Sequence, residues 1–481
     1  MDSDLFNHLE LIFNPKTVAV AGASNSLDKW GAAIFNRLLD CPSLQGLYPI
    51  NKRMAEVQGV KTFPTIMDVP GPVDFVAIAV PPEDVLEVIR ESVAKGVKAG
   101  IIITAGFGET GSEGAAMERE IVRTARAGGM RLIGPNCNGH LNTSINFSTL
   151  RTAVNKGEIA VVSQSGGFAS HILRYGTDLG VGFSKFVAVG NEADLHFEDF
   201  LEYLGQDNET KLIAGYIEGL RKGRDFFRLA KEITRKKPII VVKVGRTEAA
   251  AKAARSHTSA IAGSDAVYDA MFKQAGVIRV DTVEELFDTA TALLGQPLPK
   301  GNRIGILSSG GGFGCVTSDA CARLGLNVAP LSPATIARLS AVLSSRWPHG
   351  NPVDTVASGF VTYPCLWPLI EDDSLDAVLA VDSIGWSVGD HVALGPAGST
   401  ISSSPLEEKE LQELDNLFDH IKKYQKPVIP ATRVTPKMRN SRVFQKLKEH
   451  GITICPSPDR AAKILVNMLR YSRYLNHSTP G

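Results

Sequence analysis

The sequence has no net charge, no long hydrophobic run and few cysteines. Its Lys+Arg and Asp+Glu totals are both 51, so charge gives no reason to expect a nucleic-acid or membrane partner. No apolar run reaches the roughly 18 residues that cross a bilayer. The start, residues 1–4, lacks the basic and then apolar pattern of a secretory signal. We therefore expect a cytoplasmic globular protein.

Common catalytic signatures are also missing. The 6 cysteines are scattered with no C-x-x-C pair, and the 10 histidines do not cluster at metal-ligand spacing. The chain contains no G-x-S-x-G, no G-x-x-x-x-G-K-[ST] and no H-E-x-x-H. The sequence therefore predicts reduced thiols and no resident metal. It also excludes a nucleophile-elbow hydrolase, a P-loop enzyme and a zincin.

What the sequence does contain is a series of apolar runs of strand length, each ending in glycine, proline or a small polar residue. With 481 residues and 45 glycines, this pattern predicts an α/β fold of parallel strands and helices. The length suggests two to four domains. We expect three doubly wound domains, at residues 1–150, 151–297 and 298–472, followed by a tail at 473–481.

The first domain opens with a strand at residues 16–22, a glycine-rich turn and a helix near 30–40. Such a turn is the usual place for a nucleotide or a phosphate, although the G-x-G-x-x-G fingerprint is absent. The second strand ends in Asn51, Lys52 and Arg53, where an NAD site would have an acid. Two cations there favour a ligand with an extra phosphate, CoA or NADP. They are equally compatible with a solvated basic turn.

Two later segments share one pattern, in which an apolar strand ends in serines and glycines and a helix begins. The turn after the first of these strands runs from Ser163 to Phe168, and the turn after the second runs from Ser308 to Phe313. Their first serines are 145 residues apart. Free backbone N–H groups and the positive end of a helix suit an anion. Two such turns meeting at one phosphate could hold it without a lysine. Either turn alone could simply be a capped helix start.

The remaining candidate residues follow two other apolar runs. Glu218 ends the run at 211–217, and the run at 238–244 leads into a stretch of small residues that contains His257. Because both runs are expected in one sheet, Glu218 could hold one ring nitrogen of His257 and leave the other free to attack. The alternatives are an exposed turn glutamate and an incidental surface histidine.

Together these motifs resemble the NDP-forming acyl-CoA synthetases, relatives of succinyl-CoA synthetase with reordered domains. The resemblance is closer to the α subunits of ADP-forming acetate–CoA ligases, and it covers nearly the whole chain. It rests on residues 22–24, 136–139, 163–167, 216–219 and 256–264. It implies a Rossmann-like CoA-binding domain followed by two flavodoxin-like ligase domains.

The resemblance also implies a phosphoryl relay. Acyl-CoA and phosphate would give an acyl phosphate, which phosphorylates His257 while Glu218 steadies the ring, before ADP takes the phosphoryl group. The phosphoryl group would be cradled by Ser163, Ser165, Gly166, Gly167, Ser309, Gly310 and Gly311. Contacts with CoA would come from Gly22, Ala23, Ser24, Lys29, Asn51, Arg53, Val80, Pro81, Thr104 and Asn138.

Two positions depart from the family pattern. Ser259 stands where glycine is more usual, and Asn51-Lys52-Arg53 replaces Asn-Pro-Lys. No ATP-grasp domain is recognisable in the sequence. A separate ATP-grasp β subunit, carrying ADP or ATP with Mg2+, is therefore the expected partner in a hetero-oligomer. The expected small-molecule partner is a carboxylic acid or its acyl-CoA.

Two other functions compete with the ligase. An NADP-dependent oxidoreductase would use the first glycine-rich turn and the Lys52-Arg53 pair, but it leaves both serine–glycine turns and the His257 segment unexplained. A non-catalytic CoA-binding regulatory protein would keep the fold without turnover. The presence of both Glu218 and His257 argues against that second alternative.

Overall fold

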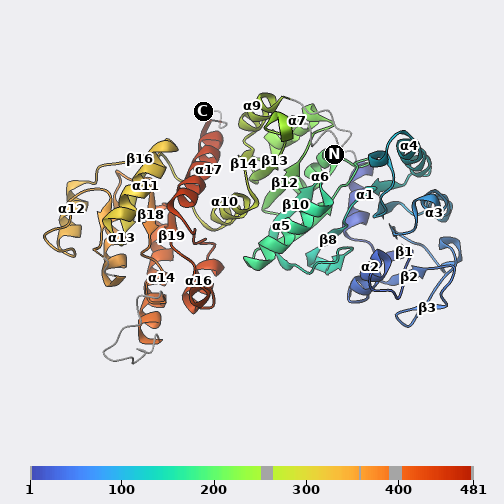
Figure 1. Ribbon diagram of the computed structural model, residues 1–481, viewed down its shortest axis with the longest axis horizontal. Helices are drawn as coiled ribbons and strands as arrows, with labels where there is room; N and C mark the ends of the chain where they lie inside the picture. Colours follow the sequence, from blue (N-terminus) through green and yellow to red (C-terminus); the bar gives the residue numbers. More distant parts are fainter. Residues whose placement is uncertain (1–2, 251–263, 357–358, 389–403, 478–481) are drawn as a thin grey trace. The chain divides into compact units, whose positions relative to one another are not determined.

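The computed structural model describes residues 3–250, 264–356, 359–388 and 404–477 (Figure 1). The chain divides into two compact units, residues 1–283 and residues 284–481. Among the described residues, the first unit contains two large sheets and a separate two-stranded sheet, and the second unit contains one large sheet. The three large sheets are built on parallel strands with helices between them, which is the α/β architecture that the spacing of apolar runs predicts.

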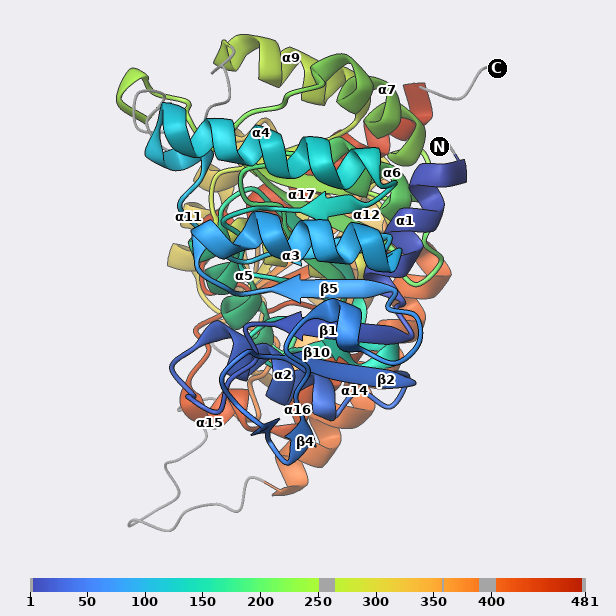
Figure 2. The same cartoon turned by 90° about the vertical axis from the view of Figure 1, so that its right-hand side faces the viewer.

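The first sheet has five parallel strands in the order β2-β1-β5-β6-β7. Four of its strands are fully buried apolar runs at their centres, because helices cover both faces, whereas the centre of the edge strand β2 is half-buried. The strands are β1 (Thr17–Ala21), β2 (Gly46–Ile50), β5 (Phe75–Ile78), β6 (Ala99–Ile102) and β7 (Arg131–Ile133). The helices are α2 (Trp30–Leu39), α3 (Pro82–Lys95) and α4 (Ser112–Ala127), and a hairpin of β3 (Glu56–Val57) and β4 (Val60–Lys61) follows β2. Figure 2 shows α3 and α4 side by side, with α3 next to β5.

The second sheet has seven strands in the order β14-β13-β12-β10-β11-β8-β9. Five are parallel, namely β10 (Asn155–Ser163), β11 (Gly182–Ala188), β12 (Leu212–Ile217), β13 (Ile239–Lys243) and β14 (Ile278–Val280). Two short antiparallel strands, β8 (His140–Asn142) and β9 (Phe147–Ser148), extend its edge. Its helices are α5 (Gly166–Asp178), α6 (Phe197–Gln206), α7 (Gly223–Ile233) and α9 (Asp265–Ala275).

Helix α1 (Ser3–Phe13) joins the two sheets of the first unit, since it contacts both β6 and β8. His140 Nε2 lies 2.9 Å from the carbonyl oxygen of Ile12, and the ring of Phe13 stacks on Tyr203. His140 is fully buried, and burial lowers its pKa to about 4. A neutral imidazole therefore serves this structural contact. The expected division at residue 150 places β8 and β9 with the first sheet, whereas their backbone hydrogen bonds place them in the second.

The second unit has one parallel sheet in the order β16-β15-β18-β19, with β17 paired to β15. The strands are β15 (Arg303–Ser308), β16 (Asn327–Val328), β17 (Val353–Asp354), β18 (Ala377–Val381) and β19 (Val428–Ala431). The helices are α10 (Val283–Gly295), α11 (Gly311–Arg323), α12 (Pro333–Ser340), α13 (Thr362–Glu371), α14 (Ser404–Tyr424), α15 (Pro436–Arg439), α16 (Arg442–Glu449) and α17 (Pro458–His477). Separate apolar clusters lie on its two faces.

Two expected boundaries differ from the structure of the second unit. Helix α10 belongs to this unit rather than to the domain expected to end at 297, because its Asp288 pairs with Arg460 of α17 at 2.6 Å. Helix α17 continues to His477, so the expected tail at 473–481 begins inside a helix. None of the helices in the described part of the chain is long and apolar enough to cross a membrane.

In each of the three large sheets, the strand before the glycine-rich turn lies between two parallel strands that come later in the chain. The orders are β2-β1-β5, β11-β10-β12 and β16-β15-β18. The chain direction across the sheet therefore switches at β1, β10 and β15. In open parallel sheets, ligands bind beyond the carboxyl ends of the strands at this switch. The three glycine-rich turns of the sequence, after residues 21, 163 and 308, all lie at these positions.

Candidate functional site

The turn after β1 is built around two glycines. Gly22 has a φ of +86°, and a Cβ there would lie 2.4 Å from the carbonyl oxygen of Ala79. Gly31, in the first turn of α2, packs against the same turn, because a Cβ at Gly31 would lie 1.9 Å from the carbonyl oxygen of Gly22. The helix start is thus pressed against the backbone of the turn, an approach that only glycine permits.

Two predicted contact residues bond to the backbone at this edge of the sheet. Asn51, after β2, donates from Nδ2 to the carbonyl oxygen of Ala23 at 2.8 Å. Its Oδ1 accepts from the backbone N–H groups of the next turn, at 2.7 and 3.0 Å. Thr104, after β6, donates to the carbonyl oxygen of Val80 at 2.6 Å. Both side chains therefore act on the protein's own backbone and shape the edge of the sheet.

The structure brings most of the predicted CoA residues to one edge. Gly22, Asn51, Val80 and Thr104 follow β1, β2, β5 and β6, which are neighbours in the first sheet. Ala23 and Ser24 are buried in the turn, and Pro81 is the residue before α3. This edge is the place where a doubly wound sheet binds its ligand.

The cations near this edge differ in their partners. Lys52 pairs with Glu87 at 3.3 Å, whereas the exposed Arg53 forms no ion pair within the described part of the chain. Lys29 is also exposed, at the residue before α2. Arg151, which the sequence did not single out, donates to the carbonyl oxygen of Asp28 at 2.8 Å. Its guanidinium stacks on the ring of Trp30 at 4.3 Å.

Asn138 connects this first edge to the second sheet. Its Nδ2 donates to the carbonyl oxygen of Gly166 at 2.6 Å and lies 3.2 Å from the hydroxyl of Ser170. Both partners belong to α5, the helix that follows the Ser163–Gly167 turn. Asn138 therefore contacts the amino end of that helix, and a ligand along the first edge would approach the second turn there.

The Ser163–Gly167 turn is an ordered helix start. Ser163 is fully buried, and its hydroxyl donates to the carbonyl oxygen of Ser165 at 2.9 Å. The Ser165 hydroxyl accepts from the N–H of Phe168 at 3.3 Å, which is a normal N-cap contact. No atom lies within 4 Å of a Cβ built at Gly167. The first turn of α5 therefore keeps open space and backbone donors for an anion.

A residue that the sequence reasoning missed, Gln164, ties this turn to Glu218. Its Oε1 accepts from the N–H of Glu218 at 2.6 Å and from the N–H of Gly219 at 3.1 Å. Its Nε2 donates to the carbonyl oxygen of Gly219 at 2.6 Å and to Oε2 of Glu192 at 2.9 Å. The sequence could have indicated Gln164 by its place between two serines, but only the serine hydroxyls and the glycines of this turn were considered as ligands.

Glu218 lies at the carboxyl end of β12 and is 8% exposed. Lys243, also missed, ends the neighbouring strand β13 and donates to the carbonyl oxygen of Glu218 at 3.0 Å. Its ammonium lies 4.4 Å from the centre of the Tyr268 ring. Burial, together with Arg279, lowers the pKa of Lys243 to about 8. A lysine inside the apolar run at 238–244 was the signal that could have identified it.

The predicted histidine, His257, lies outside the described residues, as do residues 251–263 as a whole. The described chain leaves β13 at Lys243, beside Glu218, and passes through Gly245 at a φ of +87°. The segment that carries His257 thus begins at the same edge of the sheet as Glu218 and the Ser163–Gly167 turn.

The corresponding turn of the second unit is less suited to an anion alone. Ser309 donates from its hydroxyl to Oδ2 of Asp382 at 2.9 Å. A Cβ at Gly311 would lie 3.4 Å from Oδ2 of Asp354, so two carboxylates border the start of α11. Gly310, the residue before α11, has an extended backbone, and no atom lies within 4 Å of a Cβ built there. Sequence reasoning missed Asp382, because it follows a strand that carried no site motif.

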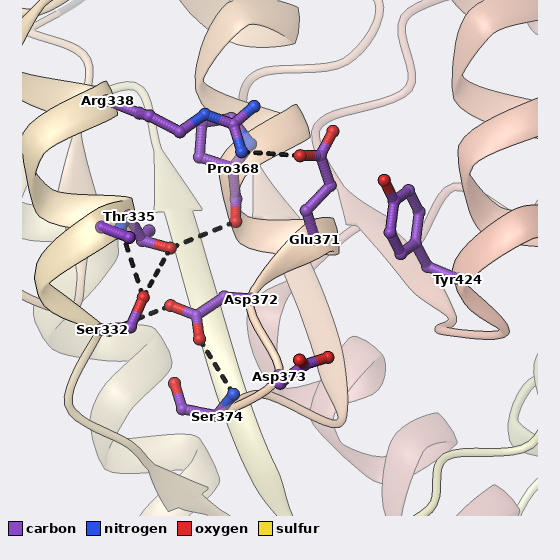
Figure 3. Close-up of a pocket in the computed structure, with 10 residues that line it drawn as sticks. Ser332, Thr335, Arg338, Pro368, Glu371, Asp372, Asp373, Ser374 and Tyr424 are labelled. Atoms are coloured by element: carbon purple, nitrogen blue, oxygen red, sulfur yellow. Dashed lines mark hydrogen bonds and ion pairs between the residues drawn. The ribbon is translucent and has the colours of Figure 1, made fainter.

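A pocket of about 420 Å³ lies elsewhere in the second unit (Figure 3). Figure 3 shows Arg338 directed at Glu371. A guanidinium N–H of Arg338 donates to Oε2 of Glu371 at 2.6 Å, and the carboxylate of Asp372 accepts from the backbone N–H groups of Ser332 and Ser374. Residues 372–374 precede β18, so the pocket lies at the amino edge of the sheet, opposite the Ser308–Gly312 turn. Within the described ranges no three His, Cys, Asp or Glu side chains are grouped to hold a metal ion.

Two family models match the first unit, and the second of them extends into α10. Residues 16–143 match a CoA binding domain, and residues 156–293 match a succinyl-CoA ligase like flavodoxin domain. The first model covers the first sheet with its Gly22 turn. The second covers the parallel strands that carry the Ser163–Gly167 turn, Glu218 and Lys243.

Curated relatives extend the match to the whole chain. The α subunit of acetate–CoA ligase [ADP-forming] II of Pyrococcus furiosus is 44% identical over 378 residues, which are 78% of this chain and 82% of that subunit. The α subunit of isoform I from the same organism is 35% identical over 97% of this chain and 98% of that subunit. Other relatives are longer, and this chain spans about half of their length.

A solved structure of a similar enzyme has the same fold as this chain. The dinucleotide forming acetyl-coenzyme A synthetase 1 of Ca. Korarchaeum cryptofilum, in complex with phosphate and ADP, is 33% identical to this chain. The match has a TM-score of 0.84 and covers 99% of this chain and 100% of that chain. The oxidoreductase and regulatory alternatives find no support in these comparisons.

Proposed function

We propose, from the premise that this chain belongs to the family of ADP-forming acetate–CoA ligases, that it is the α subunit of an acid–thiol ligase. The reaction interconverts acyl-CoA, phosphate and ADP with a carboxylic acid, CoA and ATP. The comparisons name acetate in several relatives, and acetyl-CoA is therefore the first thioester to test.

The proposed reaction has three transfers. A phosphate oxygen attacks the thioester carbonyl, the C–S bond breaks, and the CoA thiolate leaves and takes a proton. A ring nitrogen of His257 then attacks phosphorus, the P–O bond of the acyl phosphate breaks, and the carboxylate leaves. Finally a terminal oxygen of ADP takes the phosphoryl group from the ring nitrogen. Neutral imidazole is a suitable nucleophile near neutral pH.

The observation that carries this proposal is the grouping at the carboxyl edge of the second sheet. Glu218, the start of α5 and the strand end that leads toward His257 lie on neighbouring strands, and Gln164 bonds the first two together. A carboxylate near a ring nitrogen keeps the other nitrogen nucleophilic. Backbone donors at a helix start stabilise the charge that develops on a transferring phosphoryl group.

The first sheet would bind CoA along its carboxyl edge. The Gly22 turn and α2 offer backbone donors without side chains in the way, which suits a pyrophosphate. Lys29 and Arg53 are exposed cations near it, and Arg53 has no ionic partner among the described residues. We assign the phosphate contact at the second strand to Arg53 rather than Lys52, because Lys52 already pairs with Glu87.

The second unit and a partner would supply the remaining functions. We propose that Ser309, Gly310 and Gly311 also contribute to phosphate binding. An ATP-grasp β subunit would bring ADP or ATP with Mg2+ in a hetero-oligomer. We propose three domains, with the first division placed before β8 and the second at residue 283, and a cytoplasmic location as parts of the same proposal.

The test is incorporation of labelled phosphate. Wild-type chain incubated with acetyl-CoA and labelled phosphate should take up a label that survives base and is lost in acid. His257→Ala should take up none, whereas His477→Ala, a change at the exposed end of α17, should label like wild type. Equal labelling of His257→Ala and wild type would sink the assignment.

A further inference from the structure

The side chain of Gln164 links three turns at one edge of the second sheet. It is 7% exposed and leaves the chain between β10 and α5. Its four hydrogen bonds reach the turn after β12, at Glu218 and Gly219, and the turn after β11, at Glu192. The strands β11, β10 and β12 are neighbours in the sheet. One amide therefore ties the amino end of α5 to the turns on both sides.

The orientation of this amide is fixed by its partners. Oε1 faces two backbone N–H groups, at 2.6 and 3.1 Å, so an NH2 group cannot take its place. Nε2 faces two oxygen acceptors, a backbone carbonyl at 2.6 Å and a carboxylate at 2.9 Å. All hydrogen-bonding directions of the amide are satisfied away from solvent. Of the twenty side chains, only a glutamine has both the length and this combination of donor and acceptor.

We propose that Gln164 is a positioning residue of the phosphoryl-transfer site, which fixes the place of Glu218 relative to the first turn of α5. The inference rests on the proposed function. Gln164 does not need to touch the reacting atoms. It accepts from the backbone N–H of Glu218 and is the residue before Ser165, the N-cap of α5. A misplacement of about 1 Å in such a site can cost on the order of a hundredfold in rate.

Glu192 is the third member of this linkage and makes the proposal testable by pH. Its Oε1 accepts from the N–H of Phe197 at 2.7 Å, and its Oε2 accepts from Gln164. It is 4% exposed, with Glu198 near it and Arg221 at 3.9 Å. Burial and Glu198 raise the pKa of Glu192 to about 8. Its backbone also has a φ of +52°, so the turn is held in a conformation that a non-glycine residue rarely adopts.

The variant Gln164→Glu keeps the size of the side chain and replaces the NH2 by an oxygen. One oxygen can still accept from the N–H of Glu218, but the other then faces a Glu192 oxygen across the present 2.9 Å. Two carboxyls at that distance must share a proton. At low pH the shared proton replaces the lost N–H donor. Once the proton leaves, the carboxylates repel and the turns separate.

The expected result is that the labelling rate of the variant, divided by that of wild type at the same pH, falls as the pH rises. Relative to wild type, Gln164→Glu should label within about tenfold at about pH 6.5 and on the order of a hundredfold slower at about pH 9.5. Gln274→Glu, the same exchange at an exposed position of α9, should follow wild type at both pH values. Affinity for CoA should stay within about twofold in all of them.

A second variant isolates the contact with Glu192. In Gln164→Glu/Glu192→Gln the amide is on the other partner, so a donor again lies between the two side chains at high pH. The carbonyl oxygen of Gly219 still loses its donor. We therefore expect partial recovery, by at least about tenfold over Gln164→Glu at about pH 9.5.

Three results would overturn the inference while leaving the ligase function intact. They are a Gln164→Glu profile equal to wild type, a loss of CoA affinity together with labelling at both pH values, and no recovery in the double variant. A wild-type chain that takes up no base-stable label would instead contradict the proposed function itself. Wild-type labelling in the same experiment separates the two failures.

Discussion

The contact between Gly31 and the Gly22 turn gives the sharpest prediction about the first sheet. A methyl group at Gly31 would lie 1.9 Å from the carbonyl oxygen of Gly22 and 2.6 Å from its carbonyl carbon. Both atoms are backbone, so no flexible side chain can move aside. Gly31→Ala therefore has to shift α2 or the turn. Restoring an ordinary carbon–oxygen contact takes a displacement of roughly 1.5 Å.

The expected cost follows from that displacement. Forcing extra atoms into a packed interior costs about 1–3 kcal/mol, and we expect Gly31→Ala to lose that much free energy of unfolding. The same shift moves the backbone donors of the turn away from a bound CoA. We expect its affinity for CoA to fall at least tenfold, which is about 1.4 kcal/mol of binding free energy.

The assay compares chemical unfolding and calorimetric CoA titration for Gly31→Ala and a matched control. Gly223 also lies in the first turn of a helix, α7, and no atom lies within 4 Å of a Cβ built there. Gly223→Ala should therefore be neutral or gain up to about 1 kcal/mol from helix propensity. If Gly31→Ala matches Gly223→Ala in both stability and CoA affinity, the close approach of α2 to the turn is refuted.

Three further changes test the neighbouring side chains. Asn51→Asp removes the N–H that donates to the carbonyl oxygen of Ala23, so the free energy of unfolding should fall by about 1–3 kcal/mol. Urea unfolding that shows an unchanged free energy would contradict a stabilising role for this hydrogen bond. Glu218→Gln should slow phosphate labelling on the order of a hundredfold with CoA affinity retained, and rapid labelling would count against its role. Lys243 has a pKa of about 8 in the folded chain against 10.5 as its ordinary value. Between these two pH values the folded state has lost this proton and the unfolded state still holds it. The free energy of unfolding of wild type should therefore rise relative to that of Lys243→Met as pH increases from about 8 toward about 10.5. A difference in free energy of unfolding that stays constant over this pH range would disprove the shifted pKa.

Much of the architecture could be predicted because buried parallel strands appear in the sequence as apolar runs that end in glycine or a small polar residue. The strands at Thr17–Ala21, Leu212–Ile217 and Ile239–Lys243 all lie within apolar runs that the sequence shows. The likeness of the turns at Ser163 and Ser308 has a structural basis, since each follows a strand that lies between two parallel strands from later in the chain. Pattern and turn chemistry act locally, so the sequence displays them directly.

Other features depend on contacts between distant residues and leave no local pattern. Strands β8 and β9 have three and two residues, too short for periodicity to show which sheet they join. Gln164 meets partners 28 and 54 residues away. Its amide role becomes visible only when β10, β11 and β12 are placed side by side. Asn51 was expected at the ligand, and its bonds to the backbone of the turn, one as donor and one as acceptor, become visible only in the structure.

The central claim is that one imidazole carries the phosphoryl group, and locating that group tests it most directly. Wild-type chain would be labelled with acetyl-CoA and phosphate, digested under alkaline conditions and mapped by mass spectrometry. The account predicts a single phosphoryl group on the ring of His257, in the peptide that spans residues 247–265. A phosphoryl group found on any other side chain, or a chain that releases CoA without becoming phosphorylated, would contradict it.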